Sequence, residues 1–369
     1  MTEVILLRDF IEDQRNSMEL YADMMAKYLR SVDTQSLTVN EFVPNVPVWL
    51  KNRNKNGMRL ARYYSYPSQV KRKKASLFHI MDQGYGHLIH FIDPKKTIIT
   101  VHDLVPFLRW KGKIRGVKPA TIPLLVLLSN LSLKKAQHLI AVSENTKNDL
   151  VNHLGCDPKR ITVIYSGIDP IFKAFDKEKK KSLRSKWFSE DNSRKLILIT
   201  GSQFYKNHEV ALKTVALLKQ TFAEKVQLIK TGEITAEWIN SVRSYGLEQN
   251  VTNLGNVSRE SMPEIYNAVD LLFFPSVYEG FGWPPLEAMA CGTPVVASNV
   301  ASLPEVMGEI DNLSSPYDIN FFASKIGEII SDQYYREKLI IQGLHNTKRF
   351  EWKQTANNVL SVYRQILCA

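Results

Sequence analysis

Short apolar runs that each end in glycine or polar residues recur along the whole chain, and they constrain the fold more than any other feature. Each run has the length of a buried strand, and most are followed by a loop and then by helical periodicity. This order is typical of parallel sheets with helices on both faces. Ligands of such sheets bind beyond the carboxyl ends of the strands, so the residues after each run are the first candidates for a site. The clearest runs are residues 4–7, 37–39, 77–80, 98–101, 139–142, 161–164, 196–200, 226–229, 270–274 and 295–297.

The most informative loop follows the run 270–274 and extends to residue 294. It carries the carboxylate of Glu279 and the glycines Gly280 and Gly282, and two prolines then begin a short helix that contains Glu287. Glycines allow backbone N–H groups to approach a ligand closely, and a helix N-terminus favours an anion. With one carboxylate in the loop and one in the helix, the segment suits a ligand with a central phosphate and hydroxyl groups on both sides. A nucleotide-sugar has this chemistry.

Residues 274–294 closely resemble the Glu-x7-Glu signature of retaining glycosyltransferases with the GT-B fold, a large family that includes bacterial mannosyl- and glucosyltransferases. The resemblance covers most of the chain and is strongest over residues 98–170 and 196–306. It implies an α/β protein with two Rossmann-like domains, whose parallel sheets face a central cleft, and a C-terminal helix that crosses back to the N-terminal domain. We expect an N-terminal acceptor-side domain at 1–172, a linker at 173–194, a nucleotide-sugar-binding domain at 195–349 and the final helix at 350–369.

The resemblance assigns donor-binding functions to the residues of the signature. Glu287 matches the glutamate that accepts hydrogen bonds from the ribose hydroxyls, and a carboxylate suits that task because it can accept two bonds at once. Glu279 matches the glutamate that faces the donor sugar, and we expect it to be catalytic. Gly280, Phe281 and Gly282 would present backbone N–H groups to the sugar or the diphosphate.

Residues 201–207 resemble the loop that binds the diphosphate in this family. Gly201 begins the loop, and Lys206 matches the family's lysine, whose charge would offset the charge that develops on a leaving diphosphate. The loop departs from the family pattern at Tyr205, where relatives often have an arginine. Arg259 is a candidate to replace that arginine only if the fold brings it near the loop.

Loops of the N-terminal half hold further candidates. His102 follows the run 98–101 and resembles a residue that contacts the donor sugar, so we expect it to act in catalysis, although an isolated histidine after a strand is usually structural. Glu144 would line the cleft, and N-capping by the preceding Ser143 explains that turn equally well. Gly84 and Gly86 lie in a turn where an acceptor could enter.

No residue pattern predicts a metal site or a cofactor. An Asp-x-Asp motif is absent from the sequence, and the three cysteines are far apart. The resemblance implies metal-independent hexosyl transfer with retention at the anomeric carbon, with a UDP- or GDP-linked sugar as co-substrate. A double displacement requires a placed nucleophile, and the sequence identifies none. The family mechanism is a front-face reaction in which the leaving phosphate accepts the acceptor's proton.

The formal net charge of +11 is concentrated in one region. Residues 51–118 hold 16 Lys and Arg against 3 Asp and Glu, a net charge of +13. A solvated surface, an anionic membrane surface or acceptor, and nucleic acid would each account for this charge, and nucleic acid ranks last because no binding-module signature accompanies it. With no signal-peptide pattern and no apolar run long enough to span a bilayer, we expect a cytoplasmic protein, peripheral at the inner face of the cell membrane.

These observations predict a retaining glycosyltransferase that transfers a hexose from a UDP- or GDP-sugar to a saccharide or lipid-linked saccharide, in envelope or exopolysaccharide biosynthesis. A non-catalytic nucleotide-sugar-binding protein is one alternative, and the irregular diphosphate loop is its support. Another GT-B enzyme, a phosphorylase or an epimerase, is the second. The pair Glu279 and Glu287 argues against it.

Overall fold

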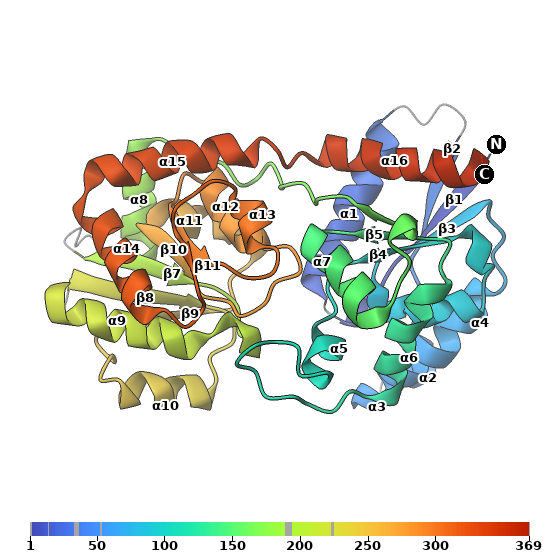
Figure 1. The fold of residues 1–369 in the computed structure, drawn as a ribbon, viewed down its shortest axis with the longest axis horizontal. Helices are drawn as coiled ribbons and strands as arrows, with labels where there is room; N and C mark the ends of the chain where they lie inside the picture. The colour runs from blue at the N-terminus through green and yellow to red at the C-terminus, as the bar shows by residue number, and fades with distance from the viewer. Residues whose placement is uncertain are drawn as a thin grey trace. The chain divides into compact units, whose positions relative to one another are not determined.

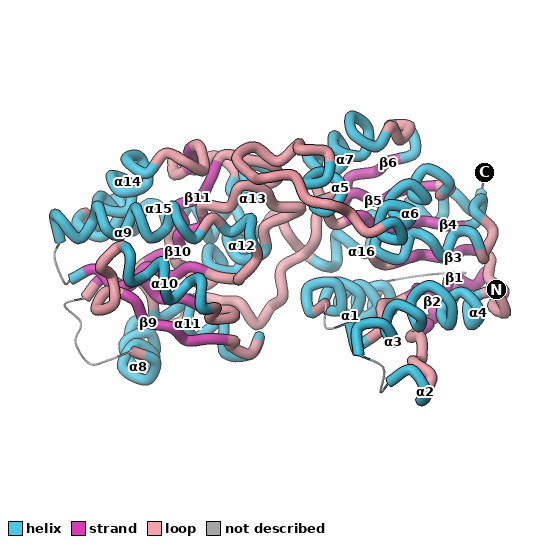
Figure 2. Tube along the Cα trace, turned by 90° about the horizontal axis from the view of Figure 1, so that it is seen from below, coloured by secondary structure: helices cyan, strands magenta, loops and turns pink. Residues whose placement is uncertain are grey.

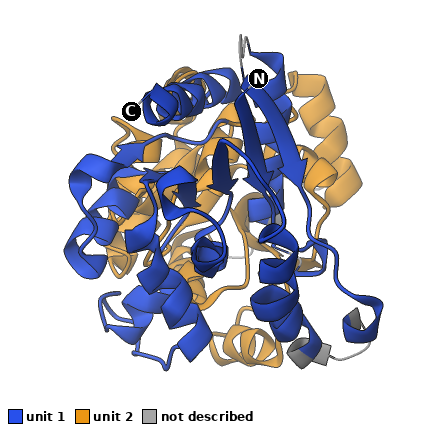
Figure 3. Ribbon diagram, turned by 90° about the vertical axis from the view of Figure 1, so that its right-hand side faces the viewer, with its two compact units in different colours: residues 1–167, 350–369 blue, residues 168–349 orange. Residues whose placement is uncertain are grey.

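The computed structural model describes residues 2–13, 15–32, 37–51, 54–188, 194–222 and 225–368. The chain forms two compact units: unit 1 contains residues 1–167 and 350–369, and unit 2 contains residues 168–349 (Figure 3). Each unit has one six-stranded sheet whose neighbouring strands all run parallel. This confirms the α/β architecture with two Rossmann-like sheets that the repeated strand–loop–helix order predicts.

The sheet of unit 1 has the strand order β2-β1-β3-β4-β5-β6 (Figure 2). Its central strands β3 and β4 are buried at every residue, as expected for a parallel sheet covered on both faces. The strands are β1 (Thr2–Leu7), β2 (Leu37–Phe42), β3 (Leu77–Ile80), β4 (Thr97–Val101), β5 (His138–Ala141) and β6 (Ile161–Val163). The helices are α1 (Asn16–Ser31), α2 (Val48–Lys51), α3 (Asn54–Leu60), α4 (Tyr66–Val70), α5 (Val105–Trp110), α6 (Leu124–Ser132), α7 (Glu144–Asp149) and α16 (Trp352–Cys368).

The C-terminal helix α16 packs against α1 in unit 1, which confirms the predicted return of the chain (Figure 1). The rings of Trp352 and Tyr21 meet edge to face at 5.6 Å. Tyr363 is fully buried, and its hydroxyl lies 2.6 Å from Nδ1 of His79 on β3. A buried polar contact of this kind fixes the position of α16 on the sheet, because separating its partners would leave both unsatisfied.

The sheet of unit 2 has the strand order β12-β11-β10-β7-β8-β9. Helix α9 packs with α14, α8 with α11 and α12 with α15. The strands are β7 (Lys195–Ile199), β8 (Val226–Thr231), β9 (Val251–Gly255), β10 (Leu271–Phe274), β11 (Val295–Ser298) and β12 (Leu313–Ser314). The helices are α8 (Lys177–Trp187), α9 (His208–Phe222), α10 (Ala236–Ser244), α11 (Met262–Ala268), α12 (Trp283–Ala290), α13 (Leu303–Met307), α14 (Ile319–Ser331) and α15 (Gln333–Thr347).

The predicted domain limits differ from the two units in two respects. The first division falls between residues 167 and 168 instead of at 172, and much of the expected linker 173–194 is helix α8 of unit 2. Asp176 caps this helix, Leu183 is buried, and Arg184 forms an ion pair with Asp270 at 3.0 Å. A segment that is rich in lysine is therefore anchored by a few residues on one face. Residues 189–193 lie outside the described residues.

Candidate active site

The loop after β7 is shaped by a left-handed glycine and a buried lysine. Gly201 has φ = 83°, a conformation that residues with a Cβ rarely adopt, and the chain then passes through a short 3-10 helix (Phe204–Lys206). Asn207 ends that turn at φ = 57° and donates hydrogen bonds to the carbonyl oxygens of Pro275 and Pro316. These bonds tie the Gly201 loop to the loop that follows β10.

Lys206 and Glu279 meet in a buried ion pair at the carboxyl edge of this sheet. Nζ of Lys206 donates to Oε1 of Glu279 at 2.8 Å, and both side chains are about nine-tenths buried. The ammonium also lies 4.3 Å from the ring centroid of Phe274, the last residue of β10. The structure thus brings together the two residues to which the sequence assigns the diphosphate and the donor sugar.

A serine that the sequence analysis did not identify forms hydrogen bonds with the loop between β10 and α12. The hydroxyl of Ser302 is fully buried and lies 3.0 Å from the carbonyl oxygen of Glu279 and 2.7 Å from that of Phe281. Gly282 caps α12 at φ = 106°, with Leu303 close to the position of a Cβ. The predicted residues Gly280, Phe281 and Gly282 therefore lie in one fixed turn before the helix. The backbone conformation at 282 favours glycine.

Glu287 lies on α12 and is the centre of a second group of polar side chains. Its Oε2 accepts a hydrogen bond from the Tyr266 hydroxyl at 3.1 Å, and its Oε1 lies 3.5 Å from Nη1 of Arg259. Arg259 also donates to Asp169 at 3.0 Å. Burial raises the pKa of Glu287, and the charge of Arg259 and the Tyr266 hydroxyl oppose that rise. Arg259, the sequence candidate for a phosphate ligand, is thus engaged with two carboxylates, one of them at the predicted ribose position.

Lys230, near the end of β8, contacts the Gly201 loop, and the sequence analysis did not identify it. It is fully buried, and its Nζ donates to the carbonyl oxygen of Gly201 at 2.8 Å and to that of Thr231 at 2.6 Å. Desolvation lowers the pKa of Lys230 to about 8. In the sequence Lys230 follows an apolar run and belongs to no motif. The pairing of β7 with β8 brings its ammonium to the carbonyl oxygen of Gly201.

His102 lies at the carboxyl end of β4 in unit 1. Its Nε2 donates to the carbonyl oxygen of Met81 at 2.9 Å, so that nitrogen carries the proton and Nδ1 is the acceptor in the neutral ring. The backbone N–H of His102 donates to Oε1 of Gln83 at 2.9 Å, and the ring packs edge to face on Tyr21. Burial lowers the pKa of His102. These contacts fix the orientation and the tautomer of the side chain.

A cluster of acidic and basic residues adjoins His102 at the same edge of unit 1. Asp82 is fully buried, accepts a hydrogen bond from the N–H of Gly84 at 2.6 Å and forms an ion pair with Arg15. Asp9, which follows β1, lies 3.7 Å from Arg15. Arg15 holds the pKa of Asp82 at about 2, whereas burial and the charge of Asp82 raise the pKa of Asp9. The sequence analysis named neither aspartate, because neither lies in a recognisable motif.

Two of the predicted acceptor residues have structural explanations. A Cβ on Gly86 would lie 2.6 Å from the carbonyl oxygen of Ser129, so this buried glycine permits close packing on α6, and its assignment to an acceptor entrance stays a prediction. A Cβ on Gly84 would approach Arg15 to 2.5 Å. Ser143 accepts a hydrogen bond from the N–H of Thr146 and caps α7, while Glu144 is exposed in the first turn of that helix.

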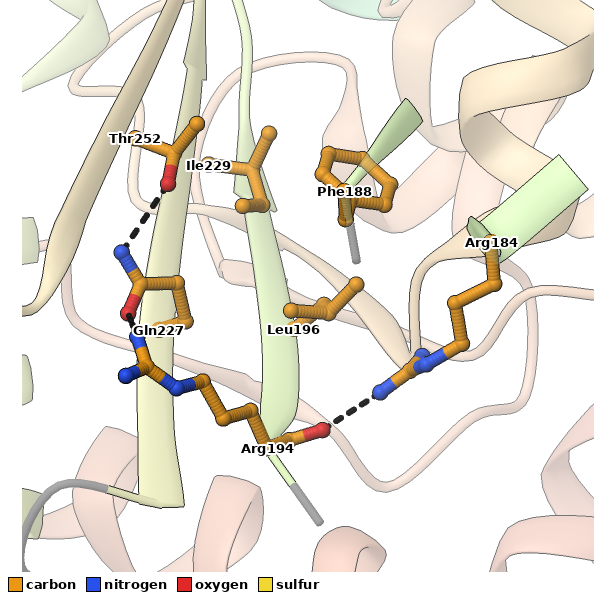
Figure 4. Close-up of a pocket in the computed structure, with 7 residues that line it drawn as sticks. All are labelled: Arg184, Phe188, Arg194, Leu196, Gln227, Ile229 and Thr252. Carbon is orange, nitrogen blue, oxygen red and sulfur yellow. Dashed lines mark hydrogen bonds between the residues drawn. The ribbon is translucent and has the colours of Figure 1, made fainter. Parts of the chain in front are cut away.

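A cavity of about 330 Å³ opens in unit 2 near the beginnings of β7 and β8 (Figure 4). The figure shows Arg194 directed at Gln227, to which it donates at 2.9 Å, and Arg184 directed at the carbonyl oxygen of Arg194. The guanidinium groups of the two arginines that line the cavity therefore have partners within the protein. The cavity lies at the amino ends of the strands, so it is not at the edge where ligands of parallel sheets bind.

Among the residues that the structure describes, no group of three or more His, Cys, Asp or Glu side chains is arranged to hold a metal ion. None of the helices in that part of the chain is both long enough and apolar enough to cross a bilayer.

Comparison with known proteins assigns the chain to a family. The family model for glycosyl transferases group 1 matches residues 179–345, and the model for glycosyltransferase family 4 matches residues 26–172. Together the two matches cover most of both units. The protein belongs to the group 1 and family 4 glycosyltransferases with the GT-B fold, which confirms the resemblance identified from residues 274–294.

Individual relatives agree with this assignment. The chain is 25% identical over 281 residues to the serotype-specific mannosyltransferase WbdA of Escherichia coli, covering 74% of this chain and 34% of WbdA. It spans about a third of the length of the first curated relatives it matches. Sucrose-phosphate synthase from Thermosynechococcus elongatus shares the fold with a TM-score of 0.78 at 19% identity, covering 100% of both chains. Anabaena HepE, solved with UDP and glucose, has a TM-score of 0.76 at 17% identity, covering 99% of this chain and 100% of HepE.

Proposed function

We propose that the protein transfers a hexose from a UDP- or GDP-sugar to a saccharide or lipid-linked saccharide, with retention and without a metal ion. The observation that carries this proposal is the buried pair of Lys206 and Glu279. A buried ammonium and a buried carboxylate satisfy each other while no ligand is bound, which offsets the cost of desolvating both. A diphosphate that displaced Glu279 from Lys206 would leave the carboxylate available to the hydroxyl groups of the sugar.

The remaining residues of unit 2 support the two ends of such a donor. Glu287, kept in place by Tyr266 and Arg259, would accept hydrogen bonds from the ribose hydroxyls. Lys206, the turn at Gly280–Gly282 and the beginning of α12 would face the phosphates. The proposal assigns His102 to the donor sugar because its loop resembles that of the family, and its Nδ1 is suited to accept a hydrogen bond from a hydroxyl group.

The proposed chemistry is a front-face substitution. The bond between the anomeric carbon and the diphosphate oxygen breaks, and a bond from the same carbon to the acceptor oxygen forms on the same face. The acceptor's proton passes to the leaving diphosphate, whose developing charge Lys206 would stabilise. Glu279 would hold a hydroxyl of the sugar or stabilise positive charge at the anomeric carbon.

Envelope or exported polysaccharide assembly, from the cytoplasmic side, is the biosynthetic context we propose. WbdA, a mannosyltransferase, and HepE, which binds UDP and glucose, support hexosyl transfer from a nucleotide-sugar. The aligned region covers 34% of WbdA, so WbdA supports the class of reaction and not a particular sugar.

Nucleotide release from a panel of UDP- and GDP-sugars, measured with and without saccharide acceptors, tests the proposal. We expect one donor to be consumed and its nucleotide released, and Glu279→Gln to reduce that rate by about 10²-fold or more. Glu337→Gln, a change at an exposed glutamate of α15, is the matched control and should retain full activity. Donor binding without any turnover would instead indicate a nucleotide-sugar-binding protein, and full activity of Glu279→Gln would contradict the site.

A further inference from the structure

Helix α6 (Leu124–Ser132) in unit 1 has its polar side buried and its apolar side exposed. A surface helix ordinarily shows the reverse arrangement. Its buried residues are Ser129, Asn130 and Ser132. Four leucines, which we call the leucine face, are exposed to 68%, 41%, 46% and 41% in the order Leu124, Leu125, Leu128 and Leu131.

The buried polar side of α6 is fully engaged, so the helix is fixed in this orientation. The hydroxyl of Ser129 lies 3.1 Å from Nδ1 of His87, and that of Ser132 lies 2.9 Å from Nε2 of His90. Asn130 donates to the carbonyl oxygen of Val126 at 2.8 Å. The backbone of Ser129 packs on Gly86, where a larger residue would not fit. Rotating the helix to bury the leucines would break the contacts of Ser129 and Ser132 with His87 and His90 and the packing on Gly86, whereas the bond of Asn130 lies within the helix and would persist.

The sequence around the leucine face carries only positive charge. Residues 104–143 contain 7 Lys and Arg and no Asp or Glu. Helix α5 contacts α6 (Figure 1), and at its end Trp110 is 38% exposed, with Nζ of Lys111 4.8 Å from its ring. Exposed lysines stand on both sides of α6 in the chain, namely Lys111, Lys113, Lys118, Lys134 and Lys135.

We propose that the leucine face binds the surface of an anionic lipid bilayer. An interfacial helix buries its apolar face at the boundary between headgroups and acyl chains, and its binding strengthens with buried apolar area and with attraction to anionic lipids. Tryptophan and lysine at the rim of an apolar patch suit the headgroup layer. A second copy of this chain would bring cations against cations across the same surface, so the charge favours lipid as the occupant.

Lipid binding by the leucine face is a property separate from the transfer reaction, and it specifies a contact surface that the basic region of the sequence did not. The charge of residues 51–118 indicated an anionic partner without specifying a contact surface. The exposed leucines place the centre of the contact further along the chain, on α6. A peripheral position of this kind would bring unit 1 to lipid-linked acceptors, although the binding itself requires no acceptor.

Flotation of the full chain with vesicles tests the proposal. We expect binding to vesicles of phosphatidylcholine with phosphatidylglycerol at least about tenfold stronger than binding to phosphatidylcholine alone, since each Lys near an anionic surface contributes measurably. The double variant Leu124→Ser/Leu128→Ser should bind anionic vesicles at least about tenfold more weakly. Its melting temperature should stay within a few degrees, because both side chains are exposed.

A matched control is available in unit 2. Ile341 and Ile239 are exposed to 69% and 39%, close to the values for Leu124 and Leu128, and Ile341→Ser/Ile239→Ser should bind vesicles like the unchanged protein. The stabilisation by UDP or GDP should be the same in all variants, which separates this test from the donor site. Equal loss of binding in both double variants, or no binding to anionic vesicles at all, would overturn the proposal. Unchanged vesicle binding with loss of a dimer in Leu124→Ser/Leu128→Ser would show a self-association surface instead.

Discussion

The carboxyl edges of the two parallel sheets differ in the charge that they present. In unit 2, Lys206 and Lys230 lie beside left-handed glycines, and Lys206 has one carboxylate, Glu279, as its partner. In unit 1, Asp9 and Asp82 share the cation Arg15. The same repeated strand–loop–helix order therefore carries lysines at one edge and a pair of carboxylates at the other, and we propose that the first suits an anion and the second hydroxyl groups.

The difference also explains why the two edges are not equally recognisable in the sequence. Gly201 and Gly282 have backbone conformations that favour glycine, so the loops of unit 2 can be recognised from short sequence motifs. The cluster in unit 1 joins residues that are far apart, such as Arg15 and Asp82. It depends on the order of the strands, which local patterns do not specify.

The largest effect is expected from removing the cation of the pair in unit 2. Lys206→Met leaves the buried carboxylate of Glu279 without its partner, so the free energy of unfolding should fall by on the order of 3 kcal/mol. Turnover should fall by about 10²- to 10³-fold, because a charge at the diphosphate is lost. Chemical denaturation and nucleotide release measure the two effects separately. If Lys206→Met retained full turnover, the diphosphate would have to bind elsewhere.

The next largest effect is expected from changing His102 at the carboxyl edge of the sheet in unit 1. His102→Phe should lower kcat by about 10²-fold, since a positioned polar group is lost, with little change in the KM of the donor. His102→Gln offers a hydrogen-bonding side chain of similar length and should recover part of the rate. A histidine with a purely structural function would instead change the melting temperature and leave kcat unaltered in the molecules that remain folded.

A smaller effect is expected at Lys230, whose ammonium donates to the backbone carbonyl oxygens of Gly201 and Thr231. Replacing a buried ammonium whose pKa is about 8 with an apolar side chain of similar size should leave the melting temperature of Lys230→Met unchanged or higher. The KM of the donor should rise about tenfold, because the Gly201 loop loses a charged anchor. In the unchanged protein KM should also rise as the pH increases through 8, and it should be flat in Lys230→Met. A pH-independent KM in both proteins would remove Lys230 from the site.

The last prediction concerns acid stability, which should differ between the units. Burial lowers the pKa of His79 to about 3 and that of His87 to about 4 in unit 1, and that of His208 to about 4 in unit 2. A folded-state pKa below the unfolded value near 6.5 means that the unfolded chain binds the proton more readily. The histidines therefore make their full contribution to the free energy of unfolding above pH 6.5. As the pH falls below 6.5, that free energy declines by up to about 1.4 kcal/mol per pH unit for each histidine.

Hydrogen exchange at pH 7.5 and 5.5 would measure this difference. Unit 1 should lose more protection than unit 2, because His102 and His138 also have lowered pKa values there. Asp9 and Glu19 act in the opposite direction, since their raised pKa values favour the folded state as the pH falls, but the histidines of unit 1 outnumber them. Equal loss in both units would show that the buried histidines do not control acid stability.

The fold could be predicted from the sequence to the extent that it depends on local periodicity. The apolar runs at 98–101 and 196–200 are strands, and Ser143 caps a helix as its spacing suggests. The segment 173–194 was predicted to be a linker from its charge, which gives no sign of helix α8 or of the ion pair between Arg184 and Asp270. In the same way, the composition of α6 does not reveal which of its sides is buried.

The residues of the candidate site could be found in the sequence to a similar extent. Glu279, Glu287 and Lys206 lie in motifs, and the structure brings Glu279 and Lys206 into contact. Lys230 and Ser302 were missed, since each acts on a backbone carbonyl of a distant loop. No sequence spacing encodes such contacts. They follow from the strand pairing and from the turn before α12.

Calorimetric titration of UDP-glucose and GDP-mannose into the double variant Lys206→Met/Glu279→Gln tests the central claim most directly. Removing both charges together avoids an unpaired buried group, so the variant should remain folded. If this pair forms the donor site, the unchanged protein should bind one of the two donors and the double variant should bind it at least about 100-fold more weakly. Equal affinities for that donor in the two proteins would contradict the account.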